Sequence, residues 1–150
     1  MQKYANLHIF AKQLHYSKLA KMKIEHLAIW VDDLEKMRQF YLTYFDVVSG
    51  EKYTNASKGF TAYFLIFGEQ KTRLELMNRP DILNEPGKRG FMKGIAHFAI
   101  SVGSKEAVNS LTERLRSDNY VIESEPRTTG DGYYESVVLD PEGNYLEISA

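Results

Sequence analysis

An internal repeat constrains this sequence more than any other feature. Residues 23–31 (KIEHLAIWV) align with residues 94–102 (GIAHFAISV) at an offset of 71. Residues 74–76 (LEL) align in the same way with residues 146–148 (LEI) at an offset of 72. Self-similarity at a nearly constant spacing is typical of a duplicated supersecondary unit. The sequence therefore predicts two similar modules, residues 23–78 and 94–149, joined by a linker at residues 79–93.

Both copies predict the element order βαβββ. The opening residues of each copy alternate in polarity as a strand does, and apolar residues at helical spacing follow. Asp32 with Glu35 resembles a capping box at the first helix, and Ser104 is the expected N-cap of the second. Three strands are expected after each helix, at residues 47–53, 60–67 and 72–77, and at residues 120–125, 133–139 and 144–149. The predicted class is α+β, with two tandem βαβββ modules forming a curved mixed sheet.

Charge separates the first residues from the rest of the chain. The 150 residues contain 19 Lys+Arg and 20 Asp+Glu, a net charge of −1. Residues 1–21 hold four lysines and no acid, so we expect a basic N-terminal extension outside a single domain at residues 22–150. The extension could form a short amphipathic helix or a transit peptide, but an extension without a catalytic role is favoured.

Composition excludes several classes of protein. The balanced charge gives no electrostatic case for a nucleic-acid partner. No apolar run approaches the roughly 18 residues that a membrane span needs, so no membrane partner is expected. The absence of cysteine excludes disulfides, thiolate zinc sites and a cysteine nucleophile. We expect a cytoplasmic protein.

Four residues with metal-binding side chains occupy equivalent positions in the two copies. His26 and His97 lie in the opening strands, and Glu75 and Glu147 lie in the last strands. If the first and last strands of a module are neighbours, each histidine can face the same side as its glutamate. A single strand histidine is more often a half-buried structural residue, and a glutamate between apolar residues usually faces solvent.

The four residues together favour a divalent metal ion. Carboxylates that converge without a cation repel one another, and a metal ion reverses the sign of that interaction. Two imidazoles with two carboxylates suit Zn, Ni, Co, Fe or Mn better than Ca or Mg. An octahedral ion would keep two positions for water or for vicinal substrate oxygens, which permits Lewis-acid chemistry with a carboxylate as base.

These motifs resemble the vicinal oxygen chelate superfamily, which includes glyoxalases, bleomycin-resistance proteins, fosfomycin-resistance enzymes, methylmalonyl-CoA epimerases and extradiol dioxygenases. The resemblance rests on the two histidine strands, on the LEL segment and on the closing segment DPEGNYLEI at residues 140–148. It covers about residues 22–150. It implies the glyoxalase/bleomycin-resistance fold. It also implies a homodimer with sites near or across the subunit interface, and the two subunits could exchange modules.

With all four ligand positions filled, the chain looks like glyoxalase I, a lactoylglutathione lyase. The resemblance implies that His26, Glu75, His97 and Glu147 bind the metal, with Glu147 the principal base and Glu75 its partner. The substrate would be a small molecule with vicinal oxygens, with a thiol adduct among the candidates. Trp30 and its neighbours replace the arginine with which glyoxalase I binds glutathione, so the use of glutathione is not implied.

Two further residues are candidates for substrate binding. Arg127 could anchor an anionic substrate from the second module, or it could be an exposed loop arginine. Trp30 alternates onto the same face as His26, so it could line the site, although core or dimer packing would also explain it. Two alternative functions remain open. One is a dioxygenase or thiol-transferase resistance enzyme of the same fold, and the other is a non-catalytic drug- or metabolite-binding protein of the bleomycin-resistance type.

Overall fold

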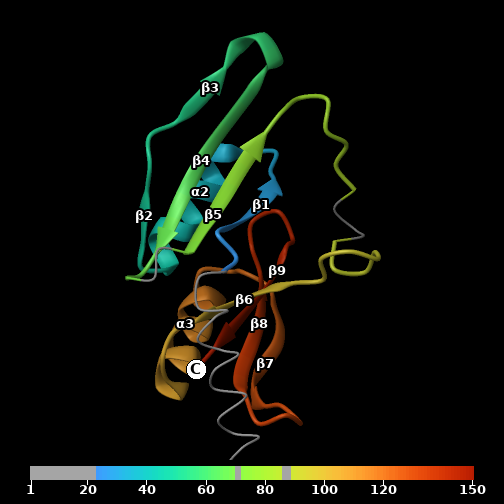
Figure 1. Ribbon diagram of the computed structural model, residues 1–150. Helices are drawn as coiled ribbons and strands as arrows, with labels where there is room; N and C mark the ends of the chain where they lie inside the picture. The colour runs from blue at the N-terminus through green and yellow to red at the C-terminus, as the bar shows by residue number, and fades with distance from the viewer. Residues whose placement is uncertain (1–22, 70–71, 86–88) are drawn as a thin grey trace, which may run out of the picture.

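The computed structural model describes residues 23–69, 72–85 and 89–150. The predicted extension at residues 1–21 lies outside the described residues. Figure 1 shows two modules, each with one helix and its own sheet. Module 1 contains β1 (His26–Trp30), α2 (Leu34–Tyr44), β2 (Val47–Ser49), β3 (Tyr53–Asn55), the 3-10 turn η1 (Ala56–Lys58), β4 (Phe60–Phe67) and β5 (Thr72–Asn78). Module 2 contains β6 (Phe98–Ser101), α3 (Lys105–Ser117), β7 (Ile122–Thr128), β8 (Tyr134–Leu139) and β9 (Tyr145–Ser149).

The α+β class and the order of elements are confirmed in both modules. One predicted strand differs, because the segment expected at residues 47–53 forms two short strands, β2 and β3. The eight-residue strand β4 is long enough to pair with both. Residues 47–49 pair with its C-terminal half, and residues 53–55 pair with its N-terminal half.

The first and last strands of each module are neighbours, which meets the condition under which each histidine can share a face with its glutamate. In module 1 the strand order is β1-β5-β4-β2, with β3 also paired to β4. In module 2 the order is β6-β9-β8-β7. The β1–β5 and β6–β9 pairs are parallel and the other pairs are antiparallel, so each sheet is mixed. Among the described residues the strands form two separate sheets.

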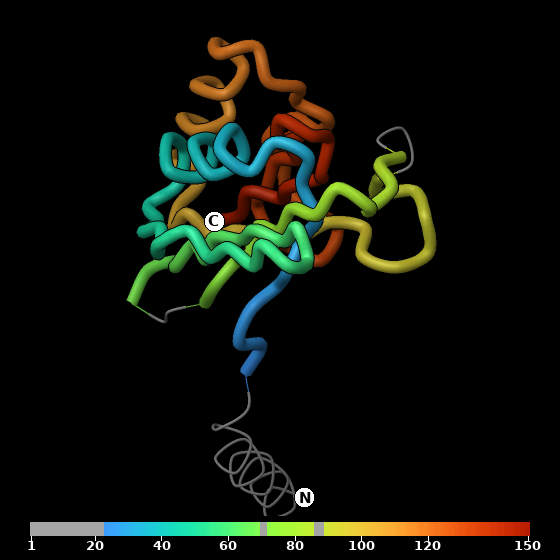
Figure 2. The backbone as a smooth tube through the Cα atoms, turned by 90° about the horizontal axis from the view of Figure 1, so that it is seen from above, coloured from blue at the N-terminus to red at the C-terminus, as the bar shows by residue number. Residues whose placement is uncertain are grey.

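One face of each sheet is covered by the helix of its module, and we call the opposite face the open face. Leu74 and Leu76 of β5 point to the helix and are buried, as are Leu146 and Ile148 of β9. These residues belong to one hydrophobic cluster that both helices share. Figure 2 shows α2 and α3 on the same side of the molecule, with the segment between the modules looping away from the body. Within the described residues no helix is long and apolar enough to span a membrane.

The start of α2 corrects one expectation. Its N-cap is Asp33, which accepts a hydrogen bond from the Lys36 backbone N–H, and not Asp32. The predicted capping box does not form, because Glu35 turns instead to Lys52. The N-cap of α3 is Ser104, as predicted.

A side chain of module 2 accepts hydrogen bonds from the backbone at the start of α2, across the junction between the modules. The Glu142 carboxylate accepts hydrogen bonds from the backbone N–H groups of Asp32 and Asp33, each at 2.8 Å. Glu142 follows Pro141 in the turn at residues 140–143, and the Gly143 N–H closes that turn on the Asp140 carbonyl. An anionic group at a helix N-terminus satisfies donors that have no partner within the helix. The modules are therefore joined by polar contacts as well as by the shared core.

Candidate metal-binding residues

The ligand pair of module 1 forms through the parallel pairing of β1 with β5. The register places Ala28 opposite Glu75, so His26 and Glu75 both project from the open face. The His26 Nε2 atom lies 3.7 Å from the Glu75 Oε2 atom. The His26 side chain is 39% exposed and that of Glu75 is 16% exposed.

Module 2 repeats this geometry. The register of β6 with β9 places Ala99 opposite Glu147, and His97 directly precedes β6 on the same face as Ala99. The His97 Nε2 atom lies 3.3 Å from the Glu147 Oε2 atom. Because His97 is 51% exposed, this ligand pair is more open than that of module 1.

The two ligand pairs lie on separate sheets. Within the part of the chain that the structure describes, no three His, Asp or Glu side chains are grouped so that they could hold a metal ion. The structure thus brings His26 to Glu75 and His97 to Glu147, but it does not bring the two pairs together in one chain.

The geometry of each pair fits two neighbouring ligands of one ion. Two donor atoms about 2.1 Å from a metal ion are separated by about 3.0–3.4 Å in octahedral or tetrahedral coordination. The separations of 3.3 and 3.7 Å are close to that range, and both pairs present the Nε2 atom of histidine. Imidazole nitrogen and carboxylate oxygen are ligands that Zn²⁺ and similar ions accept.

Two residues that the sequence analysis missed support His26. The His26 Nδ1 atom lies 2.5 Å from Glu25 Oε2, and Arg73 forms an ion pair with the other Glu25 oxygen. The hydrogen bond from His26, together with Arg73, holds the pKa of Glu25 below its ordinary value. Two features of the sequence could have indicated this role. Glu25 directly precedes His26, and Arg73 lies two residues before Glu75.

Module 2 has a different supporting residue, Glu135, which the sequence analysis also missed. Glu135 is buried, and burial raises its pKa above the ordinary value. A hydrogen bond to Glu147 and the charge of Glu147 raise this pKa further, whereas Arg127 opposes them. The Arg127 guanidinium lies 3.1 Å from Glu135 Oε1, so the predicted substrate anchor already has an anionic partner. The Arg127 side chain is nevertheless about half exposed.

Trp30 lies at the end of β1 on the same open face as His26. Its ring packs edge-on against Phe60 at 6.1 Å between centroids, and the Tyr53 ring also contacts Phe60, at 6.0 Å. The Arg79 guanidinium lies 5.4 Å from the centre of the Trp30 ring. Trp30 is thus part of a partly exposed aromatic cluster on module 1, of which the sequence analysis identified only this member.

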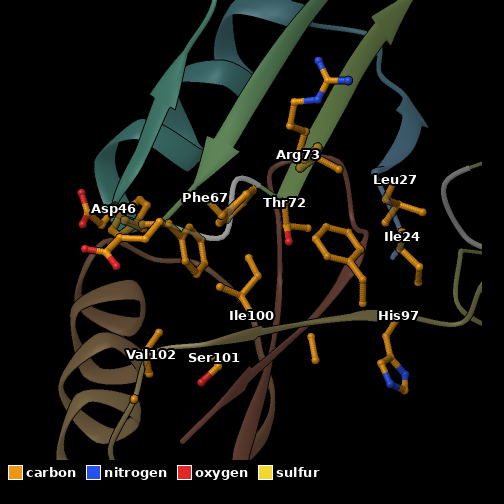
Figure 3. Close-up of a pocket in the computed structure, with 18 of the residues that line it drawn as sticks. Ile24, Leu27, Asp46, Phe67, Thr72, Arg73, His97, Ile100, Ser101 and Val102 are labelled. Carbon is orange, nitrogen blue, oxygen red and sulfur yellow. The ribbon is translucent and has the colours of Figure 1, made fainter. Parts of the chain in front are cut away.

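A large apolar cavity lies between the modules. Its volume is about 1030 Å³, and its lining includes Leu27, Phe67, Phe98 and Ile100. In Figure 3 Leu27, Phe67 and Ile100 lie around the cavity, whereas the His97 ring, at its edge, points away from it. Glu75 and Glu147 do not line it. Of the four candidate ligands, only His97 contributes to the lining of the cavity.

Comparisons with known proteins agree with this architecture. The family model described as "Glyoxalase/Bleomycin resistance protein/Dioxygenase superfamily" matches residues 23–148. An uncharacterized protein of Bacillus subtilis (strain 168), YqjT, is 25% identical over 130 residues, which cover 85% of this chain and 98% of that protein.

Solved structures are similar as well. Glyoxalase I from Zea mays superposes with a TM-score of 0.69 at 25% identity, covering 85% of this chain but only 44% of the maize protein. The trypanothione-dependent glyoxalase I of Leishmania major has a TM-score of 0.64 at 24% identity, covering 85% of this chain and 86% of that protein. A glyoxalase/bleomycin resistance protein/dioxygenase domain from Frankia sp. EAN1pec has a TM-score of 0.71 at 15% identity, covering 85% and 96% of the two chains.

Proposed function

The chain belongs to the Glyoxalase/Bleomycin resistance protein/Dioxygenase superfamily, and on this premise we propose that it is a divalent-metal-dependent lyase or isomerase of the glyoxalase type. The observation that carries this proposal is the repeated ligand pair. Both modules set a histidine Nε2 atom within 4 Å of a glutamate oxygen, on an open face that the helix of the module does not cover. The substrate would be a small molecule with vicinal oxygens.

A second copy of the chain would complete each site. Module 1 of one chain would meet module 2 of its partner, so that a homodimer would hold two sites. Each site would contain His26 and Glu75 from one chain and His97 and Glu147 from the other. The exposure of both ligand pairs and their separation within one chain support this arrangement.

The metal ion, taken from Zn, Ni, Co, Fe or Mn, would polarise the vicinal oxygens of the substrate. Glu147 would remove the proton from the carbon beside the carbonyl group and return it to the carbonyl carbon, with Glu75 as its partner. The hydroxyl proton would pass to the former carbonyl oxygen, so no proton is gained or lost over the reaction. Trp30 and Arg127 would contact the rest of the substrate from the open faces of modules 1 and 2.

One observation favours a second candidate function. The apolar cavity of about 1030 Å³ is large enough to hold a small organic molecule without any metal. A drug- or metabolite-binding protein of the bleomycin-resistance type would use such a cavity and would not turn its ligand over.

Metal analysis of protein purified without chelator separates the two candidates. We expect about one metal ion per chain, and isomerisation of the methylglyoxal–glutathione hemithioacetal or a related thiol adduct after metal reconstitution. Glu147→Gln should lower the turnover number by about 100-fold or more. Absence of stoichiometric metal, with ligand binding but no turnover in any metal form, would contradict the enzyme and favour the binding protein.

A further inference from the structure

The two ligand histidines differ in the side chain that contacts their Nδ1 atom. In module 1 the His26 Nδ1 atom lies 2.5 Å from Glu25 Oε2. An ionised carboxylate can only accept a hydrogen bond, so this contact requires a proton on Nδ1. With the proton on Nδ1, the Nε2 atom keeps its lone pair, and it is Nε2 that faces Glu75. A carboxylate at this position thus selects the tautomer that can bind a metal ion through Nε2.

The Glu25 carboxylate is itself fixed by the sheet. The parallel register places Arg73 of β5 directly beside His26 of β1, and the Arg73 guanidinium binds the Glu25 oxygen that His26 leaves free. The Phe64 ring of β4 packs against both Arg73 and His26. It lies 4.2 Å from the Arg73 guanidinium and meets the His26 ring edge-on at 5.6 Å. Glu25, although exposed and outside the strand, is therefore held in place.

Module 2 lacks this support. Ala96 precedes His97 where Glu25 precedes His26, and Tyr145 occupies the position of Arg73 two residues before the last-strand glutamate. The Tyr145 ring packs against Phe91 instead of holding a carboxylate. Among the described residues, no carboxylate contacts His97 Nδ1 in the way that Glu25 contacts His26.

We propose that Glu25, anchored by Arg73, is a positioning residue that fixes His26 in the Nδ1–H tautomer with its Nε2 atom aimed at Glu75. The consequence for metal binding rests on the proposed function. Module 1 would then be the preorganised half of the site, and module 2 the half that orders when the metal binds. Removal of such a supporting carboxylate typically weakens metal binding by about 10–100-fold.

The first test uses metal-free protein and so does not depend on the proposed function. Two-bond ¹H–¹⁵N correlation spectra at alkaline pH distinguish the two tautomers of neutral histidine. We expect His26 as the Nδ1–H tautomer in the unmodified chain, and a shift towards the Nε2–H tautomer in Glu25→Ala. The His97 signals should stay unchanged. Unchanged His26 signals in Glu25→Ala would overturn the proposal.

The second test is titration of the same proteins with Zn²⁺ by calorimetry. Glu25→Ala should bind about 10–100-fold more weakly than the unmodified chain, and Arg73→Met should weaken binding in the same direction by a smaller factor. Glu123→Ala, at an exposed glutamate of β7, is the matched control and should bind normally. Equal affinity of Glu25→Ala and the unmodified chain would overturn the proposal. If the unmodified chain binds no metal, the proposed function fails, and the tautomer measurement alone decides the role of Glu25.

Discussion

The two modules carry the same ligand pair but surround it with different side chains. In module 1 Glu25, which is paired with Arg73, contacts the histidine. In module 2 a glutamate–arginine pair, Glu135 and Arg127, lies beside the glutamate, Glu147. The ligand pairs follow from the parallel pairing of first and last strands, which both modules share. Strand pairing depends on backbone hydrogen bonds, so the side chains at neighbouring positions on the open face can diverge without loss of the ligand pair.

The helices of the two modules also differ in the hydrogen bonds that their side chains form. Tyr41 of α2 donates a hydrogen bond across the junction to Asp140 of module 2. The equivalent residue of α3, Thr112, bonds instead to Ser136 within its own module. Together with the cap that Glu142 provides, these contacts make the helix of module 1 depend on module 2. The duplicated fold is thus symmetric in the parallel pairing of its first and last strands and asymmetric in the contacts that join its halves.

The largest expected effect comes from removal of either histidine ligand. His26→Ala and His97→Ala should each weaken metal binding by more than about 100-fold, because loss of a ligand costs more than loss of its supporting residue. The measurement is competitive titration with a chromogenic chelator, with Glu123→Ala as the control. A normal affinity in either histidine variant would show that the site does not draw on both modules.

The next largest effect tests how module 2 supports module 1. Glu142→Ala leaves the Asp32 and Asp33 backbone N–H groups without their acceptor. It should lower the free energy of unfolding by about 1–3 kcal/mol. Urea denaturation measures this change, and Glu123→Ala should shift it by less than about 0.5 kcal/mol. Equal stabilities of the two variants would mean that the carboxylate cap does not join the modules.

A smaller effect distinguishes contacts across the junction from contacts within a module. Tyr41→Phe and Thr112→Val each remove one buried hydroxyl, and each should cost about 1 kcal/mol. Hydrogen exchange should separate them, since Tyr41→Phe should speed exchange in α2 and Thr112→Val should speed it in α3. Identical exchange patterns in the two variants would contradict the asymmetry of the junction.

The smallest effect is a dependence of stability on pH. Burial raises the pKa of Asp140 above its ordinary value of 3.8, although hydrogen bonds from Asn144, Glu142 and Tyr41 lower it in part. Between the ordinary and the raised value the folded chain binds more protons than the unfolded chain, so this group lowers the free energy of unfolding as pH rises. Asp140→Asn lacks this dependence. The stability of the unmodified chain relative to Asp140→Asn should therefore fall as pH rises through that window, and an increase would contradict the raised pKa.

The repeat in the sequence predicts much of this structure. It predicts two modules of the same element order. If the first and last strands of each module are neighbours, it also places His26 on the same face as Glu75 and His97 on the same face as Glu147. These features depend on alternation along strands, which is a local property. The one-residue error at the N-cap of α2 arose because Asp32 and Asp33 are both good caps. In the structure Asp33 accepts from the Lys36 backbone N–H, whereas the Asp32 side chain accepts from Asn84.

The separation of the two ligand pairs could not be predicted. It depends on how the modules pack through α2, and that packing joins residues about a hundred positions apart, such as Tyr41 and Asp140. The roles of Glu25 and Glu135 were missed because sequence adjacency does not show which side chains touch. Their contacts require the register of the sheet and, for Glu135, the neighbouring strand.

The most direct test of the proposed two-chain site combines the two histidine variants. If each site takes module 1 from one chain and module 2 from another, a mixed dimer of His26→Ala and His97→Ala contains one intact site and one site that lacks both histidines. Co-refolding equal amounts of the two inactive variants should therefore recover about a quarter of the normal metal sites, whereas each variant refolded alone should recover none. Absence of recovery, with differently tagged chains shown to form mixed dimers, would contradict a site built from two chains.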